Sequence, residues 1–299
     1  MTITITFASR KGGTGKTIAS TNVAMGLVMH GANVLFIDLD PQATATASFG
    51  INLIKNPHPS VGELLHAPQG TKHYTLDDAL MRIDLEDDEG SGDGTQGSTQ
   101  EKLGELWVLP AQYSTLDAAE TGLDYLGRTM AVRTKIIMKL SKSKVLPKID
   151  VVVIDTRPSL GVLTTNALVA SDYVIPVCTD YLEALSGAKS VVDQLDSLHE
   201  YDLKEITAKA APWVLADWAT KIGQEAKEVL EALEEFKISH FSTRLPQSKN
   251  SSKIPAYYGL PVVALLENDP FSQKVKQLVE EIITEFKLDQ ENPKLSARK

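Results

Sequence analysis

The chain alternates between apolar runs rich in β-branched residues and longer segments with helical periodicity. Uninterrupted runs of this kind fit strands that are buried on both faces of a sheet. They occupy residues 2–9, 33–40, 106–111, 151–156, 172–179, 211–217 and 260–266. Amphipathic segments that predict helices span residues 16–31, 182–201, 220–236 and 270–288. This order predicts an α/β fold with a doubly wound, mostly parallel sheet between two helical layers.

The beginning of the chain contains the best-defined unit of this pattern. Residues 2–9 are followed by a glycine-rich loop, a helical segment and the strand 33–40. Apolar residues recur at i+4 spacing in the helical segment, at Ala19, Val23 and Leu27. A strand, loop, helix and strand in this order predict a right-handed βαβ unit with parallel strands.

Composition bears on whether the protein is globular, membrane-spanning or built around disulfides or a metal. The chain has 299 residues, of which 42% are hydrophobic, so it can bury a full core. No apolar run approaches the roughly 18 residues that span a bilayer, and no signal peptide opens the chain, so we expect a soluble, cytoplasmic protein. The single cysteine, Cys178, excludes an internal disulfide and leaves too few sulfur ligands for a zinc or iron–sulfur site.

Charge and low apolar content mark two segments outside the predicted core. We expect one domain over residues 1–286, followed by a disordered tail at 287–299. Residues 86–102 are acidic, rich in Gly, Ser, Thr and Gln, and predict a mobile insertion. The formal net charge is −9, so any contact with nucleic acid must use a local basic patch.

The glycine-rich loop reads ASRKGGTGKT, residues 8–17. Small residues let backbone N–H groups converge on phosphate oxygens, and the next helix adds the positive end of its dipole. In such a loop Lys16 is placed for the β and γ phosphates and the Thr17 hydroxyl for Mg²⁺. The predicted nucleotide site comprises Lys11, Gly12, Gly13, Thr14, Gly15, Lys16, Thr17 and Ile18. Lys11 is a second lysine, which a loop wrapped around its own nucleotide does not need.

The stretch KGGTGKT, residues 11–17, resembles the deviant phosphate loop, K-G-G-x-x-K-[ST], of the ParA/MinD group of ATPases. In that group the first lysine crosses a two-fold interface to the phosphates of the other subunit, so ATP is sandwiched between two monomers. The resemblance implies that Lys16 binds ATP within its own subunit and that Lys11 acts across an ATP-dependent homodimer. Weaker similarity extends over roughly residues 3–286.

Two further stretches resemble the same family. FIDLDPQATAT, residues 36–46, is similar to switch I of the ParA/Soj branch, which implies that Asp40 orients the attacking water. VVVIDTRPSLG, residues 151–161, is similar to the Walker B and switch II segment, although Arg157 replaces the first of two usual prolines. The implied catalytic residues are Lys11, Lys16 and Asp40, and the implied magnesium site comprises Thr17, Asp40 and Asp155. ATP and Mg²⁺ are the implied cofactors.

ParA relatives, once dimerised by ATP, bind DNA without sequence preference through basic surface residues. The corresponding candidates here are Arg244, Lys249 and Lys253, in a stretch with no acidic residue between Ser239 and Leu266. The resemblance implies a partition or positioning ATPase that associates with the nucleoid when ATP is bound. A ParB-like protein or a cargo adaptor would stimulate its hydrolysis, and the cargo would be a plasmid, a chromosome or another body.

Two other functions remain open for the same loop. A MinD-like switch would bind membrane, but the predicted helix at 270–288 mixes glutamates with its lysines, so no stable membrane association is expected. A metabolic ATP-dependent ligase or amidase would need a second catalytic motif, and none is evident.

Overall fold

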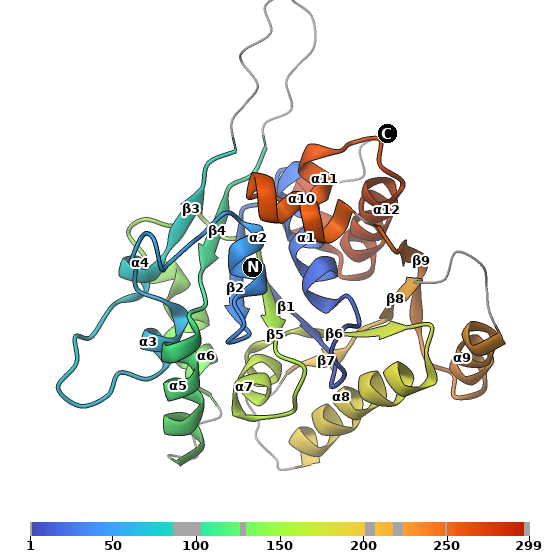
Figure 1. The fold of residues 1–299 in the computed structure, drawn as a ribbon, viewed down its shortest axis with the longest axis horizontal. Helices are drawn as coiled ribbons and strands as arrows, with labels where there is room; N and C mark the ends of the chain where they lie inside the picture. The colour runs from blue at the N-terminus through green and yellow to red at the C-terminus, as the bar shows by residue number, and fades with distance from the viewer. Residues whose placement is uncertain are drawn as a thin grey trace, which may run out of the picture.

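The structure is a computed structural model that describes residues 2–85, 103–125, 130–200, 207–217, 224–248 and 250–295 (Figure 1). The segment expected to be a mobile insertion, residues 86–102, and the candidate DNA contact Lys249 lie outside the described residues.

A mixed sheet forms the centre of the molecule. The described residues contribute nine strands to it, eight of them in the order β3-β4-β2-β5-β1-β6-β8-β9, with β7 pairing with β6. All neighbours are parallel except β3 and β4. The strands are β1 (Ile3–Ala8), β2 (Val34–Leu39), β3 (Met81–Ile83), β4 (Leu106–Leu109), β5 (Val151–Thr156), β6 (Tyr173–Thr179), β7 (Lys209–Ala210), β8 (Trp213–Asp217) and β9 (His240–Pro246). The predicted parallel α/β fold is confirmed.

Helices cover both faces of this sheet and make three layers (Figure 1). One face packs against α1 (Lys16–Met29), α2 (Thr44–Ser48), α10 (Asn250–Tyr258), α11 (Val262–Leu265), α12 (Pro270–Glu285) and α13 (Leu288–Glu291). The other packs against α3 (Val61–Leu65), α4 (Leu76–Ala79), α5 (Tyr113–Tyr125), α6 (Ala131–Lys135), α7 (Val162–Ala170), α8 (Leu182–Glu200) and α9 (Gln224–Glu235). Two 3₁₀ helices, η1 (Ile137–Lys142) and η2 (Pro293–Leu295), complete the elements of the part of the chain that the structure describes.

Alternation along the central strands places side chains in both cores. On β2, Val34 and Phe36 lie in the core beneath α1 and α12, whereas Leu35 and Ile37 lie in the core beneath α3, α5 and α7. All four are fully buried. Successive side chains of a strand point to opposite faces, so a strand covered on both sides has to be apolar throughout. This is why the central strands were visible in the sequence as continuous apolar runs.

The single cysteine belongs to this buried sheet. Cys178 lies on β6 and has no exposed surface. Burial, and to a smaller extent the negative charge of Asp180, raises the pKa of its thiol to about 12.

Two expectations about the C-terminal region were wrong. Residues 260–266 do not form a strand, because Val262–Leu265 form the short helix α11, with Pro261 as its N-cap. The tail predicted to be disordered from residue 287 contains α13 and η2, and its residues Leu288 and Leu295 are buried in the core beneath α12.

The C-terminal helix α12 packs on the core as its periodicity predicts. Its apolar stripe comprises Phe271, Val275, Leu278 and Ile282, all buried, and Asp269 caps its start by accepting a hydrogen bond from the backbone N–H of Phe271. Among the described residues, none of the helices combines the length and the apolar character that a bilayer crossing requires.

Candidate active site

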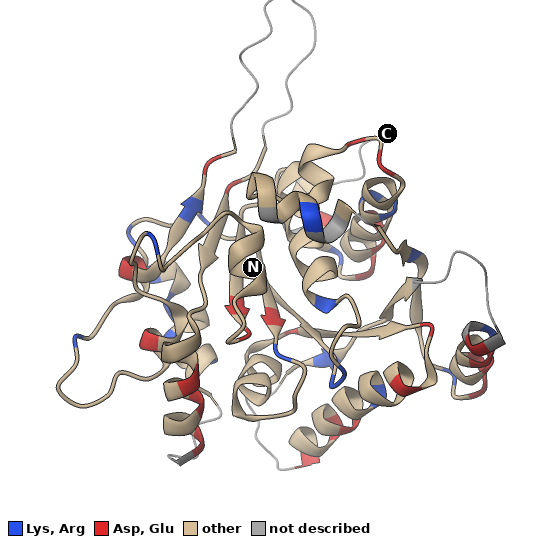
Figure 2. Ribbon diagram, viewed as in Figure 1, with Lys and Arg blue, Asp and Glu red and all other residues tan. Residues whose placement is uncertain are grey.

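The strand order brings the predicted site residues together. β1 lies between β5 and β6, and β5 lies between β1 and β2, all parallel. Segments that leave the carboxyl ends of β1, β2 and β5 therefore meet at one edge of the sheet, which is where open α/β sheets bind ligands. In Figure 2 the ends of β2 and β5 are both acidic, and the first turn of α1 beside them is basic.

The glycine-rich loop between β1 and α1 has the backbone shape that only glycine adopts easily. Gly13 and Gly15 have φ angles of 75° and 81°, in the left-handed region that disfavours side chains. Gly15 directly precedes α1, and its carbonyl accepts the backbone N–H of Ala19 at 2.8 Å. The loop thus ends on the N-terminus of a 14-residue helix, the positive end of a helix dipole.

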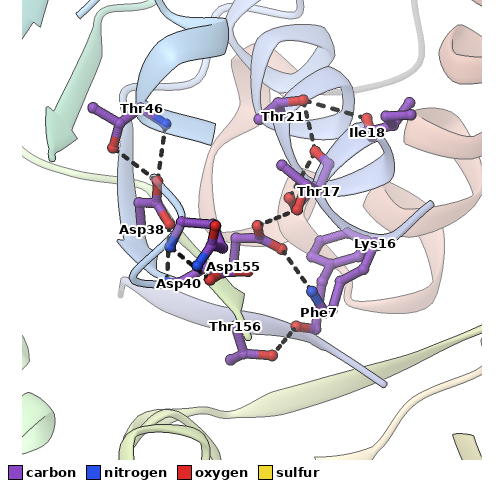
Figure 3. Close-up of polar contacts among 12 residues, drawn as sticks. Phe7, Lys16, Thr17, Ile18, Thr21, Asp38, Asp40, Thr46, Asp155 and Thr156 are labelled. Atoms are coloured by element: carbon purple, nitrogen blue, oxygen red, sulfur yellow. Dashed lines mark hydrogen bonds and ion pairs between the residues drawn. The ribbon is translucent and has the colours of Figure 1, made fainter. Parts of the chain in front are cut away.

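Lys16, Thr17 and Asp155 meet at the start of α1 (Figure 3). The Thr17 hydroxyl donates to Asp155 Oδ2 at 2.7 Å, and Lys16 Nζ lies 3.9 Å from Asp155 Oδ1. Burial raises the pKa of Asp155 above its usual value, while the charge of Lys16 and the hydrogen bond from Thr17 act in the opposite direction. The structure therefore brings together one lysine, one hydroxyl and one carboxylate from the predicted site.

Asp38 and Asp40 lie beside this group at the end of β2 (Figure 3). Asp40 is 8% exposed, and its Oδ1 accepts the backbone N–H of Gln42 at 2.9 Å. Its own backbone N–H donates to Asp38 Oδ1 at 3.0 Å. The turn that follows β2 is thus held on both sides of Asp40, which fixes its carboxylate next to Asp155.

Asp38 is a site residue that the sequence reasoning missed. Its Oδ2 accepts the backbone N–H of Thr46 at 2.9 Å and the Thr46 hydroxyl at 2.7 Å. Burial, followed by the negative charge of Asp155, raises the pKa of Asp38 to about 7. Asp38 and Asp40 are two residues apart, so a strand places both on one side. That spacing was the available signal, but the family resemblance drew attention to the second aspartate alone.

Lys11 lies apart from this cluster. It forms an ion pair with Glu183 at the start of α8, and its side chain is 40% exposed. The loop is close to α8 here, since a Cβ on Gly187 would approach Lys11 Cβ to 3.1 Å, and Arg10 donates its backbone N–H to the Gly187 carbonyl. The two lysines of the loop therefore have different surroundings, Lys16 buried against Asp155 and Lys11 near the surface.

Arg157, in the segment after β5, forms an ion pair with Glu120 of α5. The pair is partly buried, with Arg157 35% and Glu120 24% exposed. The guanidinium is thus tied to the neighbouring helix α5 in this structure.

The residues present fit a nucleotide and a magnesium ion. Thr14 Oγ1 and Asp155 Oδ1 are buried, and neither has a hydrogen-bond partner among the described residues. A hollow of about 410 Å³ opens over the loop. Its lining residues are Lys11, Gly12, Gly13, Thr14, Thr179, Tyr181 and Gln247, of which the last three were not predicted. Phosphate oxygens and a hydrated cation would supply hydrogen bonds to such polar atoms beside a concave glycine loop.

The candidate DNA contacts lie on other elements. Arg244 is half-buried on β9, and Lys253 is exposed on α10. The structure does not bring either residue to the glycine loop, so these two remain surface candidates.

Comparison with known families identifies the chain. A family model described as an AAA domain (AAA_31) matches residues 2–208, more than half of the sequence. The chain belongs to the ParA/MinD family of P-loop ATPases. Sporulation initiation inhibitor protein Soj of Bacillus subtilis is 28% identical to it over 260 residues, which cover 87% of this chain and 89% of Soj. The chromosome-partitioning ATPase Soj of Thermus thermophilus is 26% identical over 280 residues, covering 93% of this chain and 94% of that protein.

This ParA/MinD-type chain also resembles an enzyme of the same fold. The crystal structure of cobyrinic acid a,c-diamide synthase from Mycobacterium smegmatis with bound ADP and magnesium matches with a TM-score of 0.66 at 25% identity. The match covers 87% of this chain and 93% of that one.

Proposed function

We propose that this ParA/MinD-type protein is a partition or positioning ATPase of the ParA/Soj branch. It binds ATP with Mg²⁺, forms an ATP-sandwich homodimer, binds DNA without sequence preference, and hydrolyses ATP when a cargo-bound partner stimulates it. The observation that carries the proposal is the difference between the two lysines, Lys16 buried against Asp155 and Lys11 near the surface. Similarity to the chromosome-partitioning Soj of Thermus thermophilus over 93% of the chain supports the choice of branch.

Each residue of the cluster has a role in this proposal. Lys16 and the backbone N–H groups of residues 12–17 bind the phosphates of ATP. Thr17 and Asp155 hold Mg²⁺, which when bound neutralises part of the phosphate charge. Asp40, fixed beside Asp155 by its turn, positions and polarises the attacking water. Asp38 holds that turn in place through its hydrogen bonds to Asp40 and Thr46.

Lys11 contacts the nucleotide of the other subunit. Its ion pair with Glu183 is largely exposed, and exposed pairs contribute roughly 0–1 kcal/mol, so it is easily exchanged for a phosphate. A phosphate in a desolvated interface is the stronger partner, because charge-assisted hydrogen bonds gain strength where water is excluded. ATP thereby becomes part of the dimer interface.

Measuring ATP-dependent dimerisation tests this proposal directly. Lys11→Ala should retain ATP binding but lose ATP-dependent dimerisation, measured by size-exclusion chromatography with light scattering. Glu183→Gln, which removes the present partner of Lys11 without touching the loop, is the matched control and should still dimerise. A stable ATP dimer of Lys11→Ala would refute the proposed role of Lys11.

DNA binding is measured on the same samples by fluorescence anisotropy with a random-sequence duplex. Binding should require ATP, fall steeply with salt, and be lost in Lys11→Ala, because only the dimer doubles the few phosphate contacts of each subunit. Charge-removing variants at Arg244, Lys249 and Lys253 should weaken it. Confirmed dimerisation without DNA binding would show that the ATP-bound dimer acts on a surface other than DNA.

The structural likeness to the diamide synthase favours a second candidate, an ATP-dependent metabolic enzyme. That function predicts ATP consumption that depends on a small carboxylic acid and an amine donor. ATP turnover stimulated by DNA and a partner protein, but not by such metabolites, supports the partition ATPase instead.

A further inference from the structure

A second basic site lies away from the glycine loop. Residues 125–149 contain seven lysines and arginines and no aspartate or glutamate, in a chain whose net charge is −9. The structure folds the described part of this stretch into α6 and η1, which pack beside α3 and α4. Together these elements enclose a hollow of about 730 Å³, and no residue of the glycine loop lines it.

Four lysines line this hollow, namely Lys135, Lys139, Lys142 and Lys144. Lys139 and Lys142 are three residues apart in a 3₁₀ helix, where residues at that spacing lie directly above one another. Among the described residues, no ion pair involves Lys139, Lys142 or Lys144, and all three are exposed. The four lysines of the lining outnumber its two carboxylates, Glu63 and Asp77, so the hollow carries an excess of positive charge.

The acidic residues of the lining are already engaged. Glu63 accepts the backbone N–H of Ser60 at 2.6 Å, which caps α3. Asp77 accepts the Ser143 hydroxyl and, at 2.9 Å, the backbone N–H of Lys144. Asp77 thus fixes the loop that carries Lys144 instead of pairing with a lysine ammonium. Both carboxylates form part of the wall of the hollow, and neither forms an ion pair with Lys139, Lys142 or Lys144 among the described residues.

The remaining lining shows what kind of anion fits. Leu64, Ala67, Leu76 and the ring of Tyr74 add apolar surface, and the volume lies within the roughly 300–1,000 Å³ range of small-molecule sites. His66 is held against α5, since a Cβ on Gly122 would come within 2.6 Å of its ring. A compact organic ligand can enter and place its anionic groups among the lysines.

We propose that this hollow, formed by α3, α4, α6 and η1, binds a small organic ligand with two or more phosphate groups. The site is separate from the ATP site, and the proposal goes beyond the partition function. Lysines are common phosphate ligands because each ammonium is a point charge with three donors. Three lysines in one hollow fit a ligand that carries several phosphates better than a ligand that carries a single carboxylate.

The test uses inorganic tripolyphosphate, titrated calorimetrically into the full-length protein. All samples carry Lys16→Ala, which weakens phosphate binding at the glycine loop. The triple variant Lys139→Gln/Lys142→Gln/Lys144→Gln is compared with Lys55→Gln/Lys209→Gln/Lys274→Gln, which removes the same charge from exposed positions elsewhere. We expect the dissociation constant for tripolyphosphate to rise roughly tenfold or more in the first triple variant and to change less than about twofold in the second. Circular dichroism melting checks that both remain folded.

Two results would overturn the proposal. Equal affinities of the two triple variants would show that the hollow does not bind the phosphates. No tripolyphosphate binding, together with a loss of ATP-dependent random-duplex binding when the first triple, but not the second, is introduced with Lys16 intact, would assign these lysines to a nucleic-acid backbone contact. The tripolyphosphate titration depends neither on Lys11 nor on dimerisation, so failure of this proposal and failure of the partition function are distinguishable.

Discussion

Asp38 shows how one buried residue links structure and charge at the site. It accepts three hydrogen bonds, from the backbone N–H groups of Asp40 and Thr46 and from the Thr46 hydroxyl. Thr46 Oγ1 in turn accepts the backbone N–H of Ala111, so the network reaches the end of β4. Even so, burial and Asp155 dominate and raise the pKa of Asp38 to about 7. Its proton is thus gained or lost near neutral pH.

This pKa shift predicts how stability depends on pH. The ordinary pKa of an aspartate side chain is 3.8, and that of Asp38 in the folded protein is about 7, so between these values the native state binds more protons than the unfolded state. Its contribution to the free energy of unfolding is therefore largest near pH 4 and is lost as pH rises towards 7. Compared with Asp38→Asn in urea unfolding, the wild type should lose relative stability from about pH 4.5 to about pH 7.5. A difference that does not change with pH would contradict this assignment.

At the residue scale, the sequence pointed to Lys16 and Thr17 because they begin a recognisable helix after a glycine-rich loop, and the family resemblance of the strand that contains Asp155 implied its role. The sequence could not predict Asp38, whose importance depends on burial and on its partner Thr46. Nor could it predict that Lys11 would pair with Glu183, because 172 positions separate them along the chain.

At the scale of elements, α1 carries the site and α12 supports it from behind. Gly26 of α1 lies against Val279 of α12, where an added Cβ would come within 2.7 Å of Val279 Cγ2. A glycine inside a helix costs about 1 kcal/mol relative to alanine, so its presence here reflects the close approach of the two helices. The position of the loop thus depends on a contact at the far end of the helix that follows it.

Replacing this glycine tests the contact. Gly26→Ala should destabilise the fold by about 1–3 kcal/mol, because the clash with a stiff β-branched side chain outweighs the gain in helix propensity. Adding Val279→Ala should restore part of the loss, so the double variant is more stable than the two single effects predict. Denaturant unfolding of the four proteins measures this coupling. Additive effects would show that the helices adjust without strain.

Two predictions of individual elements from the sequence pattern failed. The apolar run 260–266 was assigned to a strand, but a short apolar run has no periodicity that separates strand from buried helix. Conversely, β9 was overlooked, since its buried positions alternate with exposed or half-exposed ones such as Ser242 and Arg244. A strand at the edge of the sheet carries only one fully apolar side, and its sequence resembles a loop.

At the scale of the whole molecule, the described C-terminal residues up to Leu295 pack into the main core. Leu288 and Leu295 are 2% and 1% exposed, in the core that also contains α1 and α12. Leu288→Ala and Leu295→Ala should each lower the free energy of unfolding by about 2–3 kcal/mol. Exposed Gln290→Ala is the control and should change it little. Unchanged unfolding midpoints in both leucine variants would place the tail outside the folded unit.

The buried cysteine makes the native chain suitable for site-specific labelling. Maleimide reagents react with the thiolate, and Cys178 is both inaccessible and, with a pKa of about 12, protonated at neutral pH. A cysteine introduced at Ile54, whose side chain is 92% exposed, is therefore the one position that a dye would modify. Fluorophores can be attached there without first removing a native thiol, so assembly and release can be followed in real time on an otherwise unaltered protein.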